Sequence, residues 1–341
     1  SLVNSRGKEL AVIQQTAPRP GKDIQLTIDL DVQAVAELAL EGKRGAIVAL
    51  DPRNGEVLAM ASRPAFDPNQ FTVGVSSKVW KEILENPEKP MLNRTIQAQL
   101  APGSTFKPVM ALAGLEEGVI TPQFSVVCTG TYRTPDRDFH CHARGGHGRM
   151  QLSGAMAFSC DSFFYTLGTA LGIERIAKWG ELAGLGRKTG IDLPGEQAGD
   201  LPSVAWKQRR FQQRWLLGDT VNVSIGQGYL NVTPLQLAHA TGGITTGGVW
   251  QHPHLFKGQV AAAAPPRAAK VDLDHVQAVI NAMCGVTAYG TARVAALPGV
   301  ELCGKTGTSQ LISNETIKLR QLEGRIRDNA WFVGFAPRHN A

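Results

Sequence analysis

The sequence predicts an α+β fold in which both ends of the chain supply strands to one central antiparallel sheet. Apolar and polar residues alternate near the N-terminus and again after residue 300, as expected of strands with one buried face. Between these regions the apolar residues recur at helical spacing, and no internal repeat is present. We therefore expect a sheet covered by helices, with an inserted all-helical lobe.

The N-terminal elements are a strand, a helix and a hairpin. Asp29 or Asp31 is placed to cap the helix, and the Asn-Gly pair at Asn54 is a strong hairpin signal. The polar, proline-containing residues 1–22 are expected to form a linker to a domain at residues 23–341. The predicted elements lie at residues 23–28, 32–40, 45–50 and 56–60.

Helices dominate the middle of the chain. Gly118, Gly172 and Gly184 follow stretches of helical periodicity, which is typical of helix C-termini. Thr233 precedes a proline, which is typical of a helix N-terminus. We predict helices at residues 104–117, 151–158, 162–171, 174–183, 233–240 and 271–283, and late strands at 302–311 and 331–335.

Composition limits the classes of function. The 341 residues are 43% hydrophobic, enough for a sizeable core without disulfide support. Lys and Arg number 35 against 29 Asp and Glu, and the basic residues are scattered, so no nucleic-acid partner is predicted. No run approaches the ~20 apolar residues that span a membrane, so we expect any membrane anchor to lie outside this sequence.

Two serine motifs suggest nucleophilic chemistry. Ser104 and Lys107 lie three residues apart at the start of a predicted helix, on one face of it. A hydroxyl attacks once a base removes its proton, and a lysine is such a base when burial and positive charge lower its pKa. Ser159 and Asp161 lie between two predicted helices, where they could relay a proton and hold a lysine. Taken alone, each pair is also compatible with simple helix capping.

A Lys-Thr-Gly-Thr motif falls on a predicted strand. A strand lysine and hydroxyls that face a cleft would bind a carboxylate, and a main-chain N–H there can face an oxyanion. Two similar patterns are assigned to structure only. Lys188-Thr-Gly190 opens a turn-rich connection, and the phosphate-loop pattern at 299–306 lacks the strand before it and the helix after it. The motif itself comprises Lys305, Thr306, Gly307 and Thr308.

Together the three motifs are far more specific than any one of them, and they are the signature of penicillin-binding proteins and class A β-lactamases. The sequence resembles the class B penicillin-binding proteins over nearly all of residues 23–336. Its Ser-Cys-Asp second motif is similar to the elongation-specific members, called penicillin-binding protein 2. Further matching segments are Ile24–Asp29, Gly45–Asp51, Phe66–Asn69, Ser224–Gly228, Thr233–Leu237 and Gly290–Ala292.

The resemblance implies the penicillin-recognising serine transpeptidase fold and peptidoglycan D,D-transpeptidase activity. Ser104 would attack the penultimate D-alanine carbonyl of a stem peptide, Lys107 would take its proton, and Ser159 would pass it to the leaving D-alanine while Asp161 orients the group. An amine of a second stem peptide would then resolve the acyl-enzyme, and β-lactams would acylate the same serine. The terminal carboxylate would bind Lys305, Thr306, Gly307 and Thr308, and the oxyanion the N–H groups of Ser104 and Thr308.

The same resemblance implies a cellular setting. The partners would be a polytopic glycosyltransferase and scaffold proteins of the elongation machinery, at the periplasmic face of the cytoplasmic membrane. A single N-terminal anchor and a non-catalytic module would precede residues 1–22, and the final strand and helix of the family would follow Ala341. Two alternatives stay open: a serine β-lactamase or D,D-carboxypeptidase, although no Glu-x-x-Leu-Asn element follows Ser159, and a non-catalytic β-lactam sensor.

No organic cofactor is expected, but three cysteines and a histidine suggest a structural zinc site. A Cys3His set is an ordinary zinc ligand set, although these residues lack the short Cys-x-x-Cys spacing. A Cys128–Cys141 disulfide or plain buried thiols are the alternatives. Some proteins similar to penicillin-binding protein 2 carry a metal at corresponding positions, which favours zinc. The set comprises Cys128, Cys141, His147 and Cys160, and the remaining Cys284 and Cys303 are expected to be packed thiols.

Overall fold

The computed structural model describes residues 2–338 except 7, 12, 15–16, 18, 73, 260–265 and 310–327. Its α-helices are α1 (Leu30–Ala39), α2 (Ser77–Glu85), α3 (Arg94–Gln97), α4 (Lys107–Glu116), α5 (Leu152–Ala157), α6 (Asp161–Leu171), α7 (Ile173–Leu182), α8 (Val204–Phe211), α9 (Leu217–Ser224), α10 (Pro234–Thr245) and α11 (Leu273–Ala288). Its strands are β1 (Leu2–Val3), β2 (Glu9–Ala11), β3 (Gly45–Leu50), β4 (Val57–Arg63), β5 (Ser125–Cys128), β6 (Thr131–Arg133), β7 (Asp138–His140), β8 (Gly148–Gln151), β9 (Val249–Trp250), β10 (Arg267–Ala268), β11 (Cys303–Ser309) and β12 (Asn329–Phe335).

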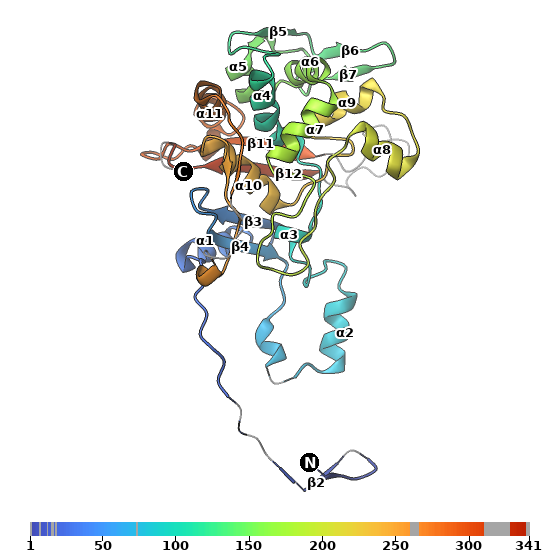
Figure 1. The fold of residues 1–341 in the computed structure, drawn as a ribbon, viewed down its shortest axis with the longest axis vertical. Helices are drawn as coiled ribbons and strands as arrows, with labels where there is room; N and C mark the ends of the chain where they lie inside the picture. The colour runs from blue at the N-terminus through green and yellow to red at the C-terminus, as the bar shows by residue number, and fades with distance from the viewer. Residues whose placement is uncertain are drawn as a thin grey trace.

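Two antiparallel strand pairs form the centre of the molecule. β3 pairs with β4, and β11 pairs with β12. In Figure 1, β11 and β12 lie between the helical lobe above and the β3–β4 pair below, with α10 and α11 alongside them. A groove of about 720 Å³ separates the pairs, and residues of β3, β12 and α10 line it. The α+β class predicted from the sequence is confirmed.

The early elements agree with the prediction except for the first strand. The Asp29 side chain caps α1 by accepting hydrogen bonds from the N–H groups of Asp31 and Val32, and the hairpin forms around Asn54. The predicted strand at 23–28 is wrong. This segment makes one isolated bridge, from Leu26 to Phe256, because its main chain is hydrogen-bonded to residues 255–257, which belong to no strand.

The lobe is built around α4, which is buried from Lys107 to Leu115. A helix that is apolar on every side must be surrounded, and α4 packs against α6, α7 and α11. The helices predicted at 151–158, 162–171 and 174–183 are confirmed as α5, α6 and α7. The predicted helix at 104–117 is also present, but it begins with a tighter 3-10 turn, η2 (Gly103–Phe106).

The lobe also contains two strand pairs that the sequence did not predict. β5 pairs with β8, and β6 pairs with β7. Each of these strands has only three or four residues, too few for periodicity to be read from the sequence. They matter for the site because β5 ends at Cys128 and the connection between β7 and β8 carries Cys141 and His147.

The two ends of the described chain differ in character. The predicted linker contains the small β1–β2 hairpin, and Figure 1 shows this hairpin extended away from the body. The late strands are confirmed as β11 and β12, while residues 310–311 of the predicted strand lie outside the described residues. Among the helices that the structure describes, none combines the length and apolarity needed to cross a bilayer.

Candidate active site

Ser104 and Lys107 lie where the 3-10 turn η2 runs into α4. Ser104 belongs to the turn, and Lys107 is the first residue of the helix. The Lys107 side chain has no exposed surface. Its Nζ donates hydrogen bonds to the Ser159 carbonyl oxygen at 2.9 Å, to Ser159 Oγ at 3.1 Å and to Asp161 Oδ1 at 2.7 Å. The fold therefore joins the first two motifs at one ammonium group.

Ser159 occupies the tight connection between α5 and α6. Its φ of 55° lies in the left-handed region, which is costly for a residue with a Cβ. Two main-chain hydrogen bonds hold the connection. The N–H of Ser159 donates to the Met156 carbonyl oxygen, and the N–H of Cys160 donates to the Ala155 carbonyl oxygen. Such conformations persist where their surroundings enforce them, and they concentrate at functional sites.

Asp161 is the first residue of α6 and connects Lys107 to His142. Burial opposes ionisation of the carboxyl group, but the Lys107 ammonium and hydrogen bonds from His142 hold the pKa of Asp161 well below its usual range. The His142 main-chain N–H donates to Oδ2 at 3.1 Å, and its ring Nδ1 lies 3.5 Å from the same oxygen. The hydrogen bond to Asp161 raises the pKa of His142 to about 9.

The third motif lies on β11, and Lys305 is fully buried there. Its Nζ donates to the Thr306 carbonyl oxygen at 2.9 Å. Burial and the nearby Lys107 ammonium lower the pKa of Lys305 well below its usual range, while Asp161 acts in the opposite direction. Because side chains alternate along a strand, Thr306 and Thr308 share one face of β11. All three motifs thus meet in one site.

Gly103 lets the main chain of β11 approach the serine turn. Its φ is 56°, and a Cβ added there would lie 2.4 Å from the Thr308 carbonyl oxygen and 3.3 Å from the Thr308 nitrogen. The Gly103 N–H donates to the Gly226 carbonyl oxygen, and Gln227 Nε2 donates to the Thr308 carbonyl oxygen at 3.0 Å. This contact places the main chain of Ser104 beside that of Thr308.

The two similar patterns lie in the local contexts that the sequence predicts, a turn and a strand. The hydroxyl and N–H of Thr189 donate to the Glu196 carboxylate, which stabilises the turn at residues 188–190. The phosphate-loop pattern at 299–306 runs into strand β11 and not into a helix.

Three free cysteines and one histidine form a compact cluster beside Ser159. The ligand atoms of Cys128, Cys141, His147 and Cys160 all lie within 4.8 Å of one another. His147 Nδ1 lies 3.6 Å from Cys128 Sγ and 3.5 Å from Cys141 Sγ. With Zn–S and Zn–N distances of about 2.3 and 2.0–2.1 Å, a tetrahedral zinc ion needs about 3.6 Å between sulfur and nitrogen ligands. The two sulfur–nitrogen separations therefore match those of a tetrahedral zinc site.

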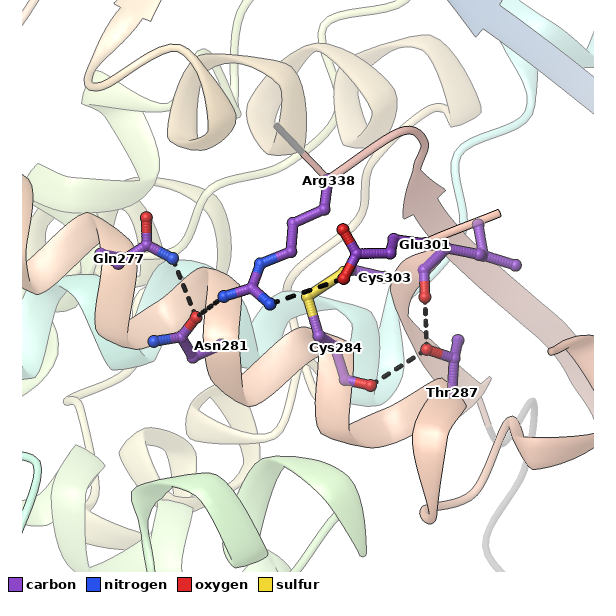
Figure 2. Close-up of a disulfide and its surroundings, with 8 residues drawn as sticks. Gln277, Asn281, Cys284, Thr287, Glu301, Cys303 and Arg338 are labelled. Carbon is purple, nitrogen blue, oxygen red and sulfur yellow. Dashed lines mark hydrogen bonds and ion pairs between the residues drawn. A yellow bond between two sulfur atoms is a disulfide. The ribbon is translucent and has the colours of Figure 1, made fainter. Parts of the chain in front are cut away.

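The prediction that Cys284 and Cys303 are free thiols is wrong, because they form a disulfide between α11 and β11. Figure 2 shows this bond, with the Thr287 hydroxyl next to it donating to the Cys284 carbonyl oxygen. The two elements pack side by side and bring the Cα atoms to 4.0 Å. A signal was present in the sequence: a Cys3His set uses three of the five cysteines and leaves two to pair.

Sequence reasoning also missed His142, Gln227 and Thr291 as parts of the site. His142 adjoins a predicted metal ligand and Thr291 lies in a segment typical of the family, but no spacing rule assigns either a partner. Asp161, the partner of His142, and Thr306, the partner of Thr291, can be identified only in the folded chain.

Comparisons with known proteins agree with this geometry. The model of the penicillin binding protein transpeptidase domain matches residues 45–341. The chain is 36% identical to the peptidoglycan D,D-transpeptidase MrdA of Escherichia coli K12, over 99% of this chain and 56% of that protein. It is 40% identical to the Pseudomonas aeruginosa PBP2 structure in complex with WCK 5153, with a TM-score of 0.86 and coverage of 94% and 72%.

A third similar structure is the complex between PBP2 and MreC from Helicobacter pylori, at 33% identity, a TM-score of 0.85 and coverage of 99% of this chain and 62% of that one. The chain spans about half the length of the curated relatives that it matches. The family match, the sequence identity to these relatives and the shared fold all indicate the same family. This chain belongs to the penicillin-binding protein transpeptidase domain family, and its relatives are of the penicillin-binding protein 2 type.

Proposed function

We propose that this chain is the catalytic part of a peptidoglycan D,D-transpeptidase that cross-links stem peptides through a serine acyl-enzyme during cell elongation. One observation carries the proposal: a fully buried Lys107, hydrogen-bonded to Ser159 and Asp161, begins the helix that directly follows the 3-10 turn carrying Ser104. A buried lysine held by hydroxyl and carboxylate groups is suited to proton transfer.

Acylation follows from this arrangement. Ser104 Oγ attacks the carbonyl carbon of the penultimate D-alanine, Lys107 in its uncharged form takes the serine proton, and the bond from that carbon to the nitrogen of the terminal D-alanine then breaks. Ser159, at 3.1 Å from Lys107 Nζ, then passes the proton to the amine of the leaving D-alanine, and Asp161 keeps Lys107 in place.

Strand β11 binds the substrate and stabilises charge. The terminal carboxylate binds the hydroxyls of Thr306 and Thr308, near the buried Lys305, while Gly307 lets the turn at Pro102 and Thr105 pack closely against β11. The N–H groups of Ser104 and Thr308 stabilise the oxyanion, which the contact at Gly103 supports.

Two measurements separate this function from its alternatives. A labelled penicillin stays bound to a transpeptidase for many minutes, whereas a β-lactamase or a fast D,D-carboxypeptidase releases it rapidly. A non-catalytic sensor also keeps the label, so the full-length protein must be supplied with lipid-linked precursor. Cross-linked product supports the transpeptidase, and stable labelling without any product would indicate a sensor.

A structural zinc ion bound by Cys128, Cys141, His147 and Cys160 is part of the proposal. The 3.5 and 3.6 Å separations between sulfur and nitrogen support it, as does the soft, buried donor set. Zinc would link Cys160, in the second motif, to the connection between β7 and β8, and so hold the Ser159 turn in place.

The proposal extends to the whole protein. By resemblance, it is held by a single N-terminal anchor at the periplasmic face of the cytoplasmic membrane, where it works with a polytopic glycosyltransferase and with scaffold proteins. The MreC complex of the Helicobacter pylori relative supports a scaffold partner. The groove between β3 and β12 supports a further strand of the full-length protein joining the two strand pairs into one sheet.

A further inference from the structure

Thr291 contacts the carboxylate-binding strand from outside the three motifs. It follows α11, is exposed, and places its Oγ1 2.6 Å from Thr306 Oγ1. This distance is short for two hydroxyl groups, so the contact is a well-formed hydrogen bond. Thr306 in turn is a partly exposed residue of β11 on the face shared with Thr308.

The main chain of Thr291 contacts the opposite side of the site. Its N–H donates to the Ala157 carbonyl oxygen at 3.0 Å, two residues before Ser159. The preceding Gly290 is pressed against the same group, because a Cβ there would lie 2.3 Å from the Ala157 carbonyl oxygen. One residue therefore links the end of α5, which leads into the Ser159 turn, to the strand that holds Thr306.

The direction of the hydroxyl contact follows from proton count. A threonine hydroxyl carries one proton, and Thr306 must donate it to bind a carboxylate. The 2.6 Å contact then persists only if Thr291 donates to Thr306. A hydroxyl that accepts one hydrogen bond is a stronger and better oriented donor to the next group.

We propose that Thr291 is a positioning residue for recognition of the substrate carboxylate: it donates to Thr306 and directs the Thr306 proton toward the bound anion. This inference rests on the proposed acyl-transfer function and adds a residue to its carboxylate-binding part. It predicts selectivity for anionic over neutral substrates and leaves the chemistry at Ser104 to the other residues.

The test compares a penicillin with its methyl ester, which lacks the anionic charge. Thr291→Val keeps the size and the main-chain N–H but removes the hydroxyl. It should lower the acylation efficiency for the acid about tenfold. The loss should come from weaker binding of the acid, while the rate constant of acylation stays similar. The acylation efficiency for the ester should change less than twofold. Thr291→Ser should restore the acylation efficiency for the acid. Thr134→Val, the same change at a half-buried turn threonine whose hydroxyl donates to the Arg137 carbonyl oxygen, is the matched control.

A double-mutant cycle with Thr306→Val makes the test sharper. If Thr291 acts through Thr306, the double variant should lose no more acylation efficiency for the acid than Thr306→Val alone loses. Additive losses would overturn the inference, as would equal losses for acid and ester or no loss for either. Failure of the acyl transfer on which the inference rests is a different result, because the unmodified protein would then form no adduct at Ser104 with either compound.

Discussion

Lys107 and Asp161 form an ion pair of 2.7 Å although 54 residues separate them in the sequence. The Lys107 side chain has no exposed surface, and the Asp161 side chain is 12% exposed. Removing two charges from water is costly, and such a pair is retained where its geometry serves a function. The pair fixes the ammonium group beside Ser159, at the start of the helix that follows the turn carrying Ser104.

The first prediction concerns this pair. Asp161→Ala should destabilise the protein by about 3–5 kcal/mol, because the Lys107 ammonium is then buried without a counter-charge. Asp161→Asn keeps a hydrogen-bond acceptor for Lys107, so its free energy of unfolding should fall clearly less. Urea unfolding followed by tryptophan fluorescence measures both values. Little or no loss of stability in both variants would show that the carboxylate charge does not stabilise Lys107.

The second prediction concerns pH. The pKa of Lys305 is lowered in the folded state, so between that value and the unfolded value of ~10.4 the unfolded chain binds a proton that the folded chain lacks. The free energy of unfolding therefore rises with pH across this window. Lys305→Met should abolish acylation. It should also stabilise the protein by about 2 kcal/mol at pH 7, and this difference in stability from the unmodified protein should disappear toward pH 10.

The exposed Lys257 provides the control for this measurement. Lys257→Met should follow the unmodified protein at every pH in the urea series. The interpretation fails if Lys305→Met keeps a constant stability difference from the unmodified protein between pH 7 and 10.

The third prediction concerns the disulfide. Cys284 and Cys303 enclose a loop with a sequence separation of 19, for which loop-closure entropy gives about 3 kcal/mol of stabilisation. Cys284→Ala should lose about this amount, and reductant should lower the unmodified protein to the same stability. Cys303→Ala should match it, with no further loss in the double variant. A reductant that leaves the unfolding curve unchanged would count against this role.

The fourth prediction concerns zinc. Metal analysis of the purified protein should give close to one zinc ion per chain, and chelation should lower the melting temperature and make three thiols titratable. His147→Ala should lose the metal. His140→Ala, an exposed histidine of the neighbouring strand β7, should keep it. Three freely reacting thiols in metal-free native protein would remove the proposal.

Local signals in the sequence were sufficient for much of the fold. The cap at Asp29, the turn at Asn54 and the helix-ending Gly118 each act within a few residues, so their elements were predictable. The three motifs could be recognised because their residue types and order are specific as a set. The strand predicted at 23–28 failed because alternation alone does not supply a partner strand.

Contacts between distant segments could not be read from the sequence in this way. The hydrogen bonds from His142 to Asp161 and between Thr291 and Thr306 depend on how loops pack after folding. The Cys284–Cys303 bond likewise depends on α11 lying beside β11. Cysteine count narrows such pairings, but geometry decides them.

The most direct test of the account is the position of the penicillin adduct. Mass spectrometry of the digested, penicillin-treated protein should find a single acylated residue, Ser104. The adduct should vanish in Ser104→Ala and form far more slowly in Lys107→Met. An adduct on another residue, or undiminished labelling of Ser104→Ala, would contradict the central claim that the fold assembles these motifs into an acylating site.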